Sequence, residues 1–229
     1  MAIWWEVEDA LEAIIDDYEK VNHVISFFQD DKTRILGLKK IGTKESVVLE
    51  LGSGPGNFTQ MIRTENNGEI ICLDYSEKMI NRAREKNNIK RVSFVRGIFE
   101  KLPIRGEIID HTISAYALRD SKKKVMTYGE IGRVLREHGK LILIDIGKPN
   151  NRIIQGFFSL YMRFLVPIMA GLAAGYGFRN PWSILYKTYE LLPSNQGLRV
   201  LMNNNIGRAE VMEISFGGLV VAVAEKTYV

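Results

Sequence analysis

The 229-residue sequence is poor in the residues that form cross-links and metal sites. It has one cysteine, Cys72, so no internal disulfide can form, which favours a reducing compartment and a cytoplasmic protein. Its three histidines lie far apart in the sequence, which leaves little material for a zinc site, and we expect no metal. The net charge of +4 is too small to indicate a nucleic-acid-binding protein.

The sequence also lacks an uninterrupted apolar segment long enough to span a membrane. The nearest candidate, residues 153–177, is broken by Arg163 and Pro167. Its longest uncharged run, residues 164–178, is shorter than the ~20 residues that a spanning helix needs. The first twenty residues carry seven acidic side chains against one lysine, unlike the basic start of a signal peptide. We therefore interpret residues 153–178 as buried or interfacial helices. Basic residues in or beside them could meet lipid headgroups: Arg152, Arg163, Arg179 and Lys187.

From residue 46 onward, short apolar runs alternate with helical patterns, as is typical of a doubly wound, mostly parallel α/β sheet. The predicted strands are residues 46–51, 69–74, 91–96, 108–114 and 140–146. The predicted helices between them are residues 57–64, 76–86 and 122–136. Ser76 is the predicted N-cap of the second of these helices, and a turn at His138-Gly139 ends the third.

Pro149 ends this alternation. Residues 150–205 have helical patterns and are expected to lie over one end of the sheet. Two apolar strands, residues 209–216 and 219–226, are separated only by Gly217-Gly218, which predicts an antiparallel hairpin and one reversed strand at the end of the sheet. The expected organisation is a single domain with an N-terminal helical cover (1–43), a core (44–148), a helical lid insertion (149–205) and a terminal β-hairpin (206–229).

A glycine-rich loop, Gly52-Ser53-Gly54-Pro55-Gly56, follows the first predicted strand, where open α/β sheets bind ligands. Glycine allows positive φ and close approach of a ligand to the backbone. The loop lacks the Gly-Lys-Ser/Thr of a P-loop, and Asn57 stands where the dinucleotide fingerprint needs glycine. Glu50 precedes the loop, where a carboxylate would repel pyrophosphate but could pair with an ammonium group.

The second predicted strand ends at Asp74, where a carboxylate can accept both hydroxyls of a ribose. Acids before the glycine loop and after the second strand suit a zwitterionic amino acid joined to a nucleoside without a pyrophosphate. S-adenosylmethionine (SAM) is such a molecule. We therefore expect SAM as the cofactor and S-adenosylhomocysteine as its product.

The stretch Glu50–Gly56 (ELGSGPG) together with Asp74 resembles the class I SAM-dependent methyltransferases, which implies a Rossmann-like sheet with helices on both faces. Further stretches resemble one branch, the ubiquinone/menaquinone biosynthesis C-methyltransferases. These are residues 18–26 (YEKVNHVIS), 97–103 (GIFEKLP), 112–120 (TISAYALRD), 131–135 (IGRVL), 142–149 (ILIDIGKP) and 216–218 (FGG). The similarity runs from about Asp16 to the C-terminus. The chain departs from the family pattern at Ile98, Asp120 and Asp145, where the family usually has Asp, Asn and Glu.

The resemblance implies a cofactor site at the ends of the strands. The residues it implies are Tyr18, Glu50, Gly52, Ser53, Gly54, Gly56, Asp74, Tyr75, Met79, Gly97, Ile98, Phe99 and Ser114. The aromatic face of Tyr18 would attract the sulfonium charge, although a packing role for the helix stripe of Tyr18, Asn22 and Ser26 stays open.

The resemblance also implies methylation of a ring carbon in a quinol precursor that carries an isoprenoid tail. A ring hydroxyl must then lose its proton, which calls for a base and for a cation that holds the phenolate. The resemblance places Arg119 beside the substrate, although a surface salt bridge with Asp120 is the alternative. The base stays open between Asp145, Asp120, Tyr116 and a water held by Arg119.

Other readings stay open at this point. The substrate could be another lipid or small molecule methylated on carbon, oxygen or nitrogen, or the chain could bind SAM or lipid without catalysis. The apolar segment of residues 153–178 could form a channel for an isoprenoid tail, a surface in contact with a membrane, or both. A homo-oligomer is also open.

Overall fold

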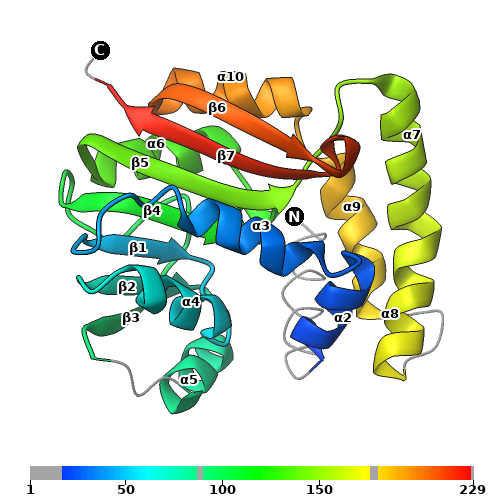
Figure 1. Ribbon diagram of the computed structural model, residues 1–229, viewed down its shortest axis with the longest axis horizontal. Coiled ribbons are helices and arrows are strands. Elements are labelled where there is room, and N and C mark those ends of the chain that lie inside the picture. Colours follow the sequence, from blue (N-terminus) through cyan, green and yellow to red (C-terminus); the bar gives the residue numbers. More distant parts are fainter. Residues whose placement is uncertain (1–16, 87–89, 176–179, 228–229) are drawn as a thin grey trace.

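The computed structural model describes residues 17–86, 90–175 and 180–227 (Figure 1). Its centre is a seven-stranded sheet in the order β3-β2-β1-β4-β5-β7-β6. The strands are β1 (Val48–Leu51), β2 (Ile70–Asp74), β3 (Val92–Arg96), β4 (Ile109–Ala115), β5 (Leu135–Ile146), β6 (Gly207–Ile214) and β7 (Leu219–Lys226). β1 to β5 pair in parallel, whereas β7 is antiparallel to both β5 and β6. The predicted sheet, mostly parallel with a terminal antiparallel hairpin, is confirmed.

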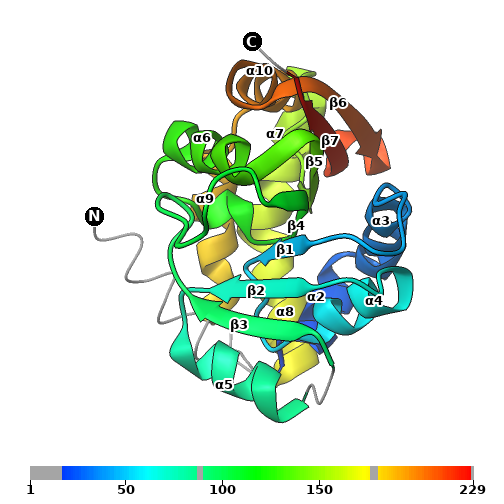
Figure 2. The same ribbon diagram turned by 90° about the vertical axis from the view of Figure 1, so that its left-hand side faces the viewer.

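The central strands are largely buried because both faces of the sheet are covered. Every residue of β1 is buried, and so is the Leu141–Ile144 run of β5. One face is covered by α3 (Gln29–Leu38) and α4 (Asn57–Glu65), and the other by α6 (Lys124–Val134) and α10 (Asn195–Asn205) (Figure 2). The sheet therefore separates two apolar cores.

A third core lies beyond the carboxyl ends of the parallel strands (Figure 1). It joins α2 (Tyr18–Ile25) to the inserted helices α7 (Arg152–Leu160), α8 (Val166–Ala174) and α9 (Ile184–Glu190), and its largest fully buried side chains are Trp182 and Tyr189. A π-helical turn at Tyr161–Leu165 joins α7 to α8 without a break. Pro167, which has no N–H to donate, follows this wider turn. The insertion covers the end of the sheet, as expected.

The helix α5 (Glu77–Lys86) lies against β2 and β3. Its first turn is capped as predicted, because the Ser76 Oγ accepts a hydrogen bond from the Met79 N–H at 3.3 Å.

The boundary between α6 and β5 differs from the prediction. The helix ends at Val134 and β5 begins at Leu135, so His138-Gly139 lies within the strand and does not end the helix. Leu135 pairs with Ile109, the register then shifts, and His138 has a φ of 58°. An irregularity in the strand therefore takes the place of the predicted turn.

The terminal hairpin also differs in detail. Its connection spans four residues, because Ser215–Gly217 forms a 3-10 turn before Gly218. The reversed strand β7 lies between β5 and β6 and not at the edge of the sheet. The more apolar β7 is buried inside the sheet, whereas β6 carries exposed polar residues at the edge.

Candidate functional site

The glycine loop between β1 and α4 has a backbone that other residues adopt only with strain. Gly52, Gly54 and Gly56 have φ values of 71°, 54° and 83°. A Cβ atom at Gly52 would collide with the Cβ of Ala117, whereas one at Gly54 would meet nothing within 4 Å. The loop is thus packed tightly at its first glycine and leaves open space beside the second.

Asp74 links the end of β2 to this loop. Its Oδ2 accepts a hydrogen bond from the Gly54 N–H at 2.8 Å, and its Oδ1 accepts one from the Ser76 N–H at 2.9 Å. Burial raises the pKa of Asp74, and these backbone donors oppose that rise. Each carboxylate oxygen can accept a further hydrogen bond, so Asp74 retains capacity for ligand hydroxyls.

Ser53 supplies an observation that tests the fit of a cofactor. Its Oγ is buried and has no hydrogen-bond partner among the described residues. A buried hydroxyl without a partner is uncommon and often marks the place of a ligand or an ordered water. The Ser53 hydroxyl, the open backbone at Gly54 and the spare acceptors of Asp74 together fit SAM.

Glu50 is more enclosed than the sequence suggested. The residue is 1% exposed, and its Oε2 accepts hydrogen bonds from the Thr59 hydroxyl at 2.6 Å and from the Cys72 thiol at 3.5 Å. Burial raises the pKa of Glu50 from 4.5 to about 7, although both hydrogen bonds oppose the rise. Its observed contacts are internal, so its pairing with a ligand ammonium group stays a prediction.

The remaining cofactor residues implied by the resemblance lie at the same edge of the sheet in different environments. Tyr75 and Ile98 are exposed, and Met79 is buried. The Ser114 hydroxyl donates to the Leu51 carbonyl at 2.9 Å, which holds β4 against the end of β1.

Phe99 and Gly97 pack against the core. The Cζ atom of Phe99 lies 3.4 Å from the place of a Cβ at Gly52, and a Cβ at Gly97 would press on Leu73. The side chain of Tyr18 lies outside the described residues.

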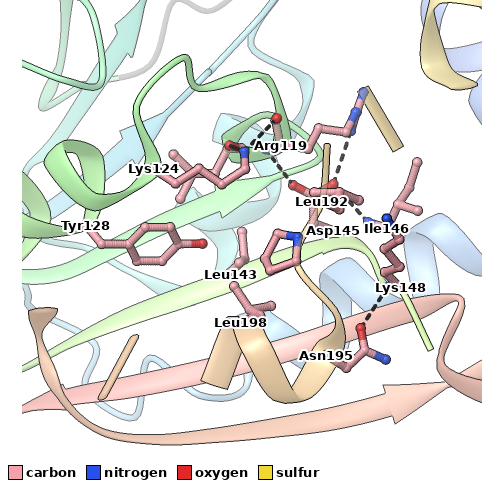
Figure 3. Close-up of a pocket in the computed structure, with 12 residues that line it drawn as sticks. Arg119, Lys124, Tyr128, Leu143, Asp145, Ile146, Lys148, Leu192, Asn195 and Leu198 are labelled. Carbon is pink, nitrogen blue, oxygen red and sulfur yellow. Dashed lines mark hydrogen bonds and ion pairs between the residues drawn. The ribbon is translucent and has the colours of Figure 1, made fainter. Parts of the chain in front are cut away.

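Arg119 lies on the turn after β4 and is 5% exposed (Figure 3). Its Nη1 lies 3.2 Å from the Asp145 Oδ1, and its backbone N–H donates to the Asp145 Oδ2 at 3.1 Å. The same Nη1 donates to the Tyr116 carbonyl at 2.5 Å. The alternative of a salt bridge with Asp120 is right in its partner but wrong in its surface location. The Arg119 Nε lies 3.7 Å from the Asp120 Oδ1, Arg119 is buried, and Asp145 is its closer acidic partner.

Two further charges complete this cluster. Burial raises the pKa of Asp120 to about 6, although the nearby Arg119 lowers it. The Lys124 Nζ donates to the Arg119 carbonyl at 2.9 Å, and burial lowers the pKa of this amine. In Figure 3, Lys124, Tyr128 and Asp145 surround a small cavity of about 20 Å³, which has room for about one water.

A much larger cavity, of about 570 Å³, lies between the sheet edge and the helices of the third core. Arg119 and Ile146 line both cavities, whereas Asp145 lines only the small one. Asn22 and Ser26 line the large cavity, as their shared helix face predicted, and so does Asp30. The sequence prediction missed Asp30, which lies in the next helix, α3, and not on the helix face of Asn22.

Tyr116 also lines the large cavity, but its hydroxyl is already engaged. The hydroxyl lies 2.6 Å from the Thr33 Oγ1, and burial raises the pKa of Tyr116 well above its usual range. Its backbone has a φ of 59°, which turns the chain after β4 so that Arg119 can reach the sheet edge.

The sequence profile of the ubiE/COQ5 methyltransferase family matches residues 4–227 of this chain. The chain belongs to this family. It is similar to the demethylmenaquinone methyltransferases of Staphylococcus saprophyticus, at 26% identity over 95% of this chain and 94% of that protein, and of Lactococcus lactis, at 29% over 85% and 79%. A solved SAM-dependent methyltransferase from Thermotoga maritima shares the fold, with a TM-score of 0.68 at 18% identity over 96% of this chain and 99% of that one. The protein is a SAM-dependent methyltransferase.

The raised pKa of Glu50 predicts how the stability of this methyltransferase depends on pH. As pH rises from 4.5 toward 7, Glu50 ionises in the unfolded chain while the buried carboxyl stays protonated, so the free energy of unfolding falls. The Glu50→Gln variant, which keeps an acceptor for Thr59, should lose this fall. Relative to wild type it should gain on the order of 3 kcal/mol between pH 4.5 and 8, measured by urea unfolding. Glu45→Gln, at an exposed site, is the control, and an equal response of both variants would contradict the assignment.

The contacts of Asp74 predict a loss of cofactor affinity. Asn at this position offers one acceptor oxygen where the carboxylate has two, so the loop and the ribose would compete for it. Asp74→Asn should raise the Kd for SAM by about 10- to 100-fold, measured by isothermal titration calorimetry. Glu69→Gln, at an exposed site near the opposite end of β2, should bind SAM as wild type does. Unchanged affinity in Asp74→Asn would overturn this placement of the cofactor.

Proposed function

We propose that this protein methylates a ring carbon of a quinol precursor with an isoprenoid tail, in menaquinone or ubiquinone biosynthesis. The observation that carries the proposal is the large cavity, which is apolar along most of its wall and has the buried Arg119 at the sheet edge. A hydrophobic tail and a polar ring head need this combination of surfaces. The relatives named demethylmenaquinone methyltransferase support the same substrate class.

The polar end of the cavity can stabilise a phenolate. When bound, SAM supplies an electrophilic methyl group, and Ser53, the glycine loop and Asp74 would hold it. Asp145 and the Tyr116 carbonyl fix the Arg119 guanidinium at the cavity wall, so little reorganisation is needed when negative charge develops on a ring oxygen. Because Asp145 accepts hydrogen bonds from the Arg119 side chain and from two backbone N–H groups, it orients Arg119.

The apolar part of the cavity suits an isoprenoid tail. Its wall includes Phe158, Met162 and Val166 of the inserted helices, with Leu185 and Leu219 beside them. Phe27 and Phe216 also line the cavity and are themselves exposed, so aromatic side chains connect its interior to the outer surface. A tail longer than the cavity could therefore extend outward between these residues.

We further propose that the outer face of α7 and α8 contacts a membrane. Apolar side chains spaced three or four residues apart are exposed along one side of this helix: Ile153, Phe157, Leu160, Phe164, Ile168 and Leu172. Residues 152–174 contain Arg152 and Arg163 but no acidic residue, which suits anionic lipid headgroups. By length and composition alone, the helix of residues 152–174 could cross a membrane. On its inner side, however, Val166 and Ala170 are buried in the third core. Contact along the membrane surface fits that packing better than crossing.

The direct test of the proposed substrate uses SAM labelled on its methyl group. The protein is incubated with this SAM and a reduced lipid extract from cells blocked in quinone methylation. We expect label in a methylated quinol recovered in the organic phase. Label in another lipid or in the aqueous phase would assign a different substrate. Normal SAM binding without transfer to any fraction would instead support a non-catalytic SAM-binding protein.

The proposed membrane face is tested by sedimentation with vesicles that contain phosphatidylglycerol. Burying each large apolar side chain contributes about 1.5–3 kcal/mol, so the double variant Phe157→Ser with Leu172→Ser should bind vesicles at least tenfold more weakly. Val125→Ser removes an equally exposed apolar side chain from α6 and is the control. If the wild-type protein does not sediment with vesicles and instead forms dimers through this face, the membrane assignment is contradicted.

A further inference from the structure

We propose that Asp30 is the general base that takes the proton from the ring hydroxyl of the substrate, and that His23 passes this proton to solvent. The inference rests on the proposed function and names a catalytic residue for it. It starts from the large cavity, where Asp30 is the only carboxylate among the described residues of the lining.

Asp30 holds its charge in a nearly water-free place. The residue is 1% exposed, the Ser26 hydroxyl donates to its Oδ1 at 2.8 Å, and the Arg34 Nη1 lies 2.9 Å from its Oδ2. The His23 Nδ1 lies 2.9 Å from the same Oδ2. Burial disfavours the ionised form, but these hydrogen bonds and the Arg34 charge outweigh it and hold the pKa of Asp30 below its usual range. The carboxylate is therefore ionised and ready to accept a proton.

Asp30 and Arg119 approach the cavity from two sides of Tyr116. Arg34, which binds Asp30, lies over the Tyr116 ring with 5.4 Å between the guanidinium carbon and the ring centroid. On its other side, the Tyr116 carbonyl accepts the hydrogen bond from Arg119. A ring hydroxyl placed along this wall would have an acceptor for its proton at one side and a cation for the resulting oxyanion at the other.

The other candidates for the base are less suitable. Asp145 and Asp120 do not line the large cavity. The Tyr116 hydroxyl is hydrogen-bonded to Thr33, and burial raises its pKa, so it stays protonated and does not supply a phenolate that could act as the base.

The reaction releases one net proton, which a single carboxylate can accept and pass to water. The ring O–H bond breaks and an O–H bond forms on Asp30, while the electron pair left on the ring oxygen raises the electron density of the adjacent carbon. That carbon bonds the methyl group, and the electron pair of the methyl–sulfur bond stays on sulfur. The ring carbon then loses its own proton and the ring oxygen regains a proton, which restores the aromatic ring and its hydroxyl, so one net proton leaves for each methyl transferred. The His23 side chain contacts Asp30 and is 30% exposed, so it connects the cavity wall to solvent.

A cation between these side chains is already present. The ligand atoms of His23, Asp30 and Asp31 lie within 4.8 Å of one another, a grouping that could hold a metal. The Arg34 Nη1, however, lies 2.9 Å from Asp30 and 3.0 Å from Asp31. This guanidinium balances the charge of both carboxylates, so the group needs no metal ion for that purpose.

The kinetic test compares Asp30→Asn with Asp31→Asn. Asp31 contacts the same Arg34 and His23, but its side chain is 53% exposed and does not line the cavity. With a quinol that the wild type methylates, Asp30→Asn should lower kcat by about 10²- to 10⁴-fold with little change in the KM for SAM. Asp31→Asn should stay within about threefold of wild type, and equal losses in both variants would show that Asp30 only holds Arg34.

The pH profile separates a base from a packing residue. Without its base, the Asp30→Asn variant can methylate only the fraction of quinol that is already ionised in solution. At pH values below the pKa of the quinol, this fraction rises about tenfold per pH unit, and the kcat of the variant should rise with it. The charged or titratable groups facing Asp30 are His23 from α2, Arg34 and Asp31 from α3, and Tyr116 after β4, and all are retained. A flat profile for the variant would overturn the proposal.

A binding measurement in the absence of SAM completes the test. Wild type should bind 1-naphthol about tenfold more tightly than its methyl ether, because only the hydroxyl can donate to Asp30, and Asp30→Asn should lose most of this preference. Equal binding of the two compounds by wild type would overturn the proposal. A wild type that binds 1-naphthol with this preference but methylates no quinol would instead contradict the proposed function.

Discussion

Arg119 carries a full charge into the interior of the protein, where loss of hydration costs several kcal/mol unless partners replace the water. Asp145 replaces it on one side and the Tyr116 carbonyl on the other. Because Asp145 also binds the backbone N–H groups of Arg119 and Ile146, a single carboxylate joins the ends of β4 and β5. These hydrogen bonds hold the Arg119 guanidinium at the edge of the sheet, where the proposed reaction needs a cation.

The rest of the site is arranged around this edge. The glycine loop and Asp74 lie after β1 and β2, the charged cluster lies after β4 and β5, and the third core closes the space in front of the cluster. The parallel sheet brings these loops together because parallel strands end at one edge. The helices that cover this edge enclose a cavity with a mostly apolar wall and with Arg119 at the sheet edge. The proposed cofactor and substrate regions therefore belong to different layers of one molecule.

Much of the fold could be predicted from local sequence signals. Buried strands, the glycine loop and the Ser76 cap each depend on residues next to one another in the sequence, and the predictions agree with the structure there. The start of β5 was wrong because residues 135–139 pair with β4 through an irregular register that no local pattern reveals. Asp30 was missed for a similar reason. Its burial depends on His23, Ser26 and Arg34 folding around it, and its place in the cavity depends on helices more than a hundred residues away.

The position of β7 has a consequence for how the chain folds during its synthesis. Among the strands of this sheet β7 is synthesised last, yet it lies between β5 and β6. Until residues 219–226 emerge, β5 has an open flank and β6 has no partner in the sheet, so the nascent chain presents an unpaired, highly apolar strand edge. The sheet therefore cannot close until β7 has been synthesised, and during that interval the unpaired β5 edge is open to aggregation or to binding by chaperones.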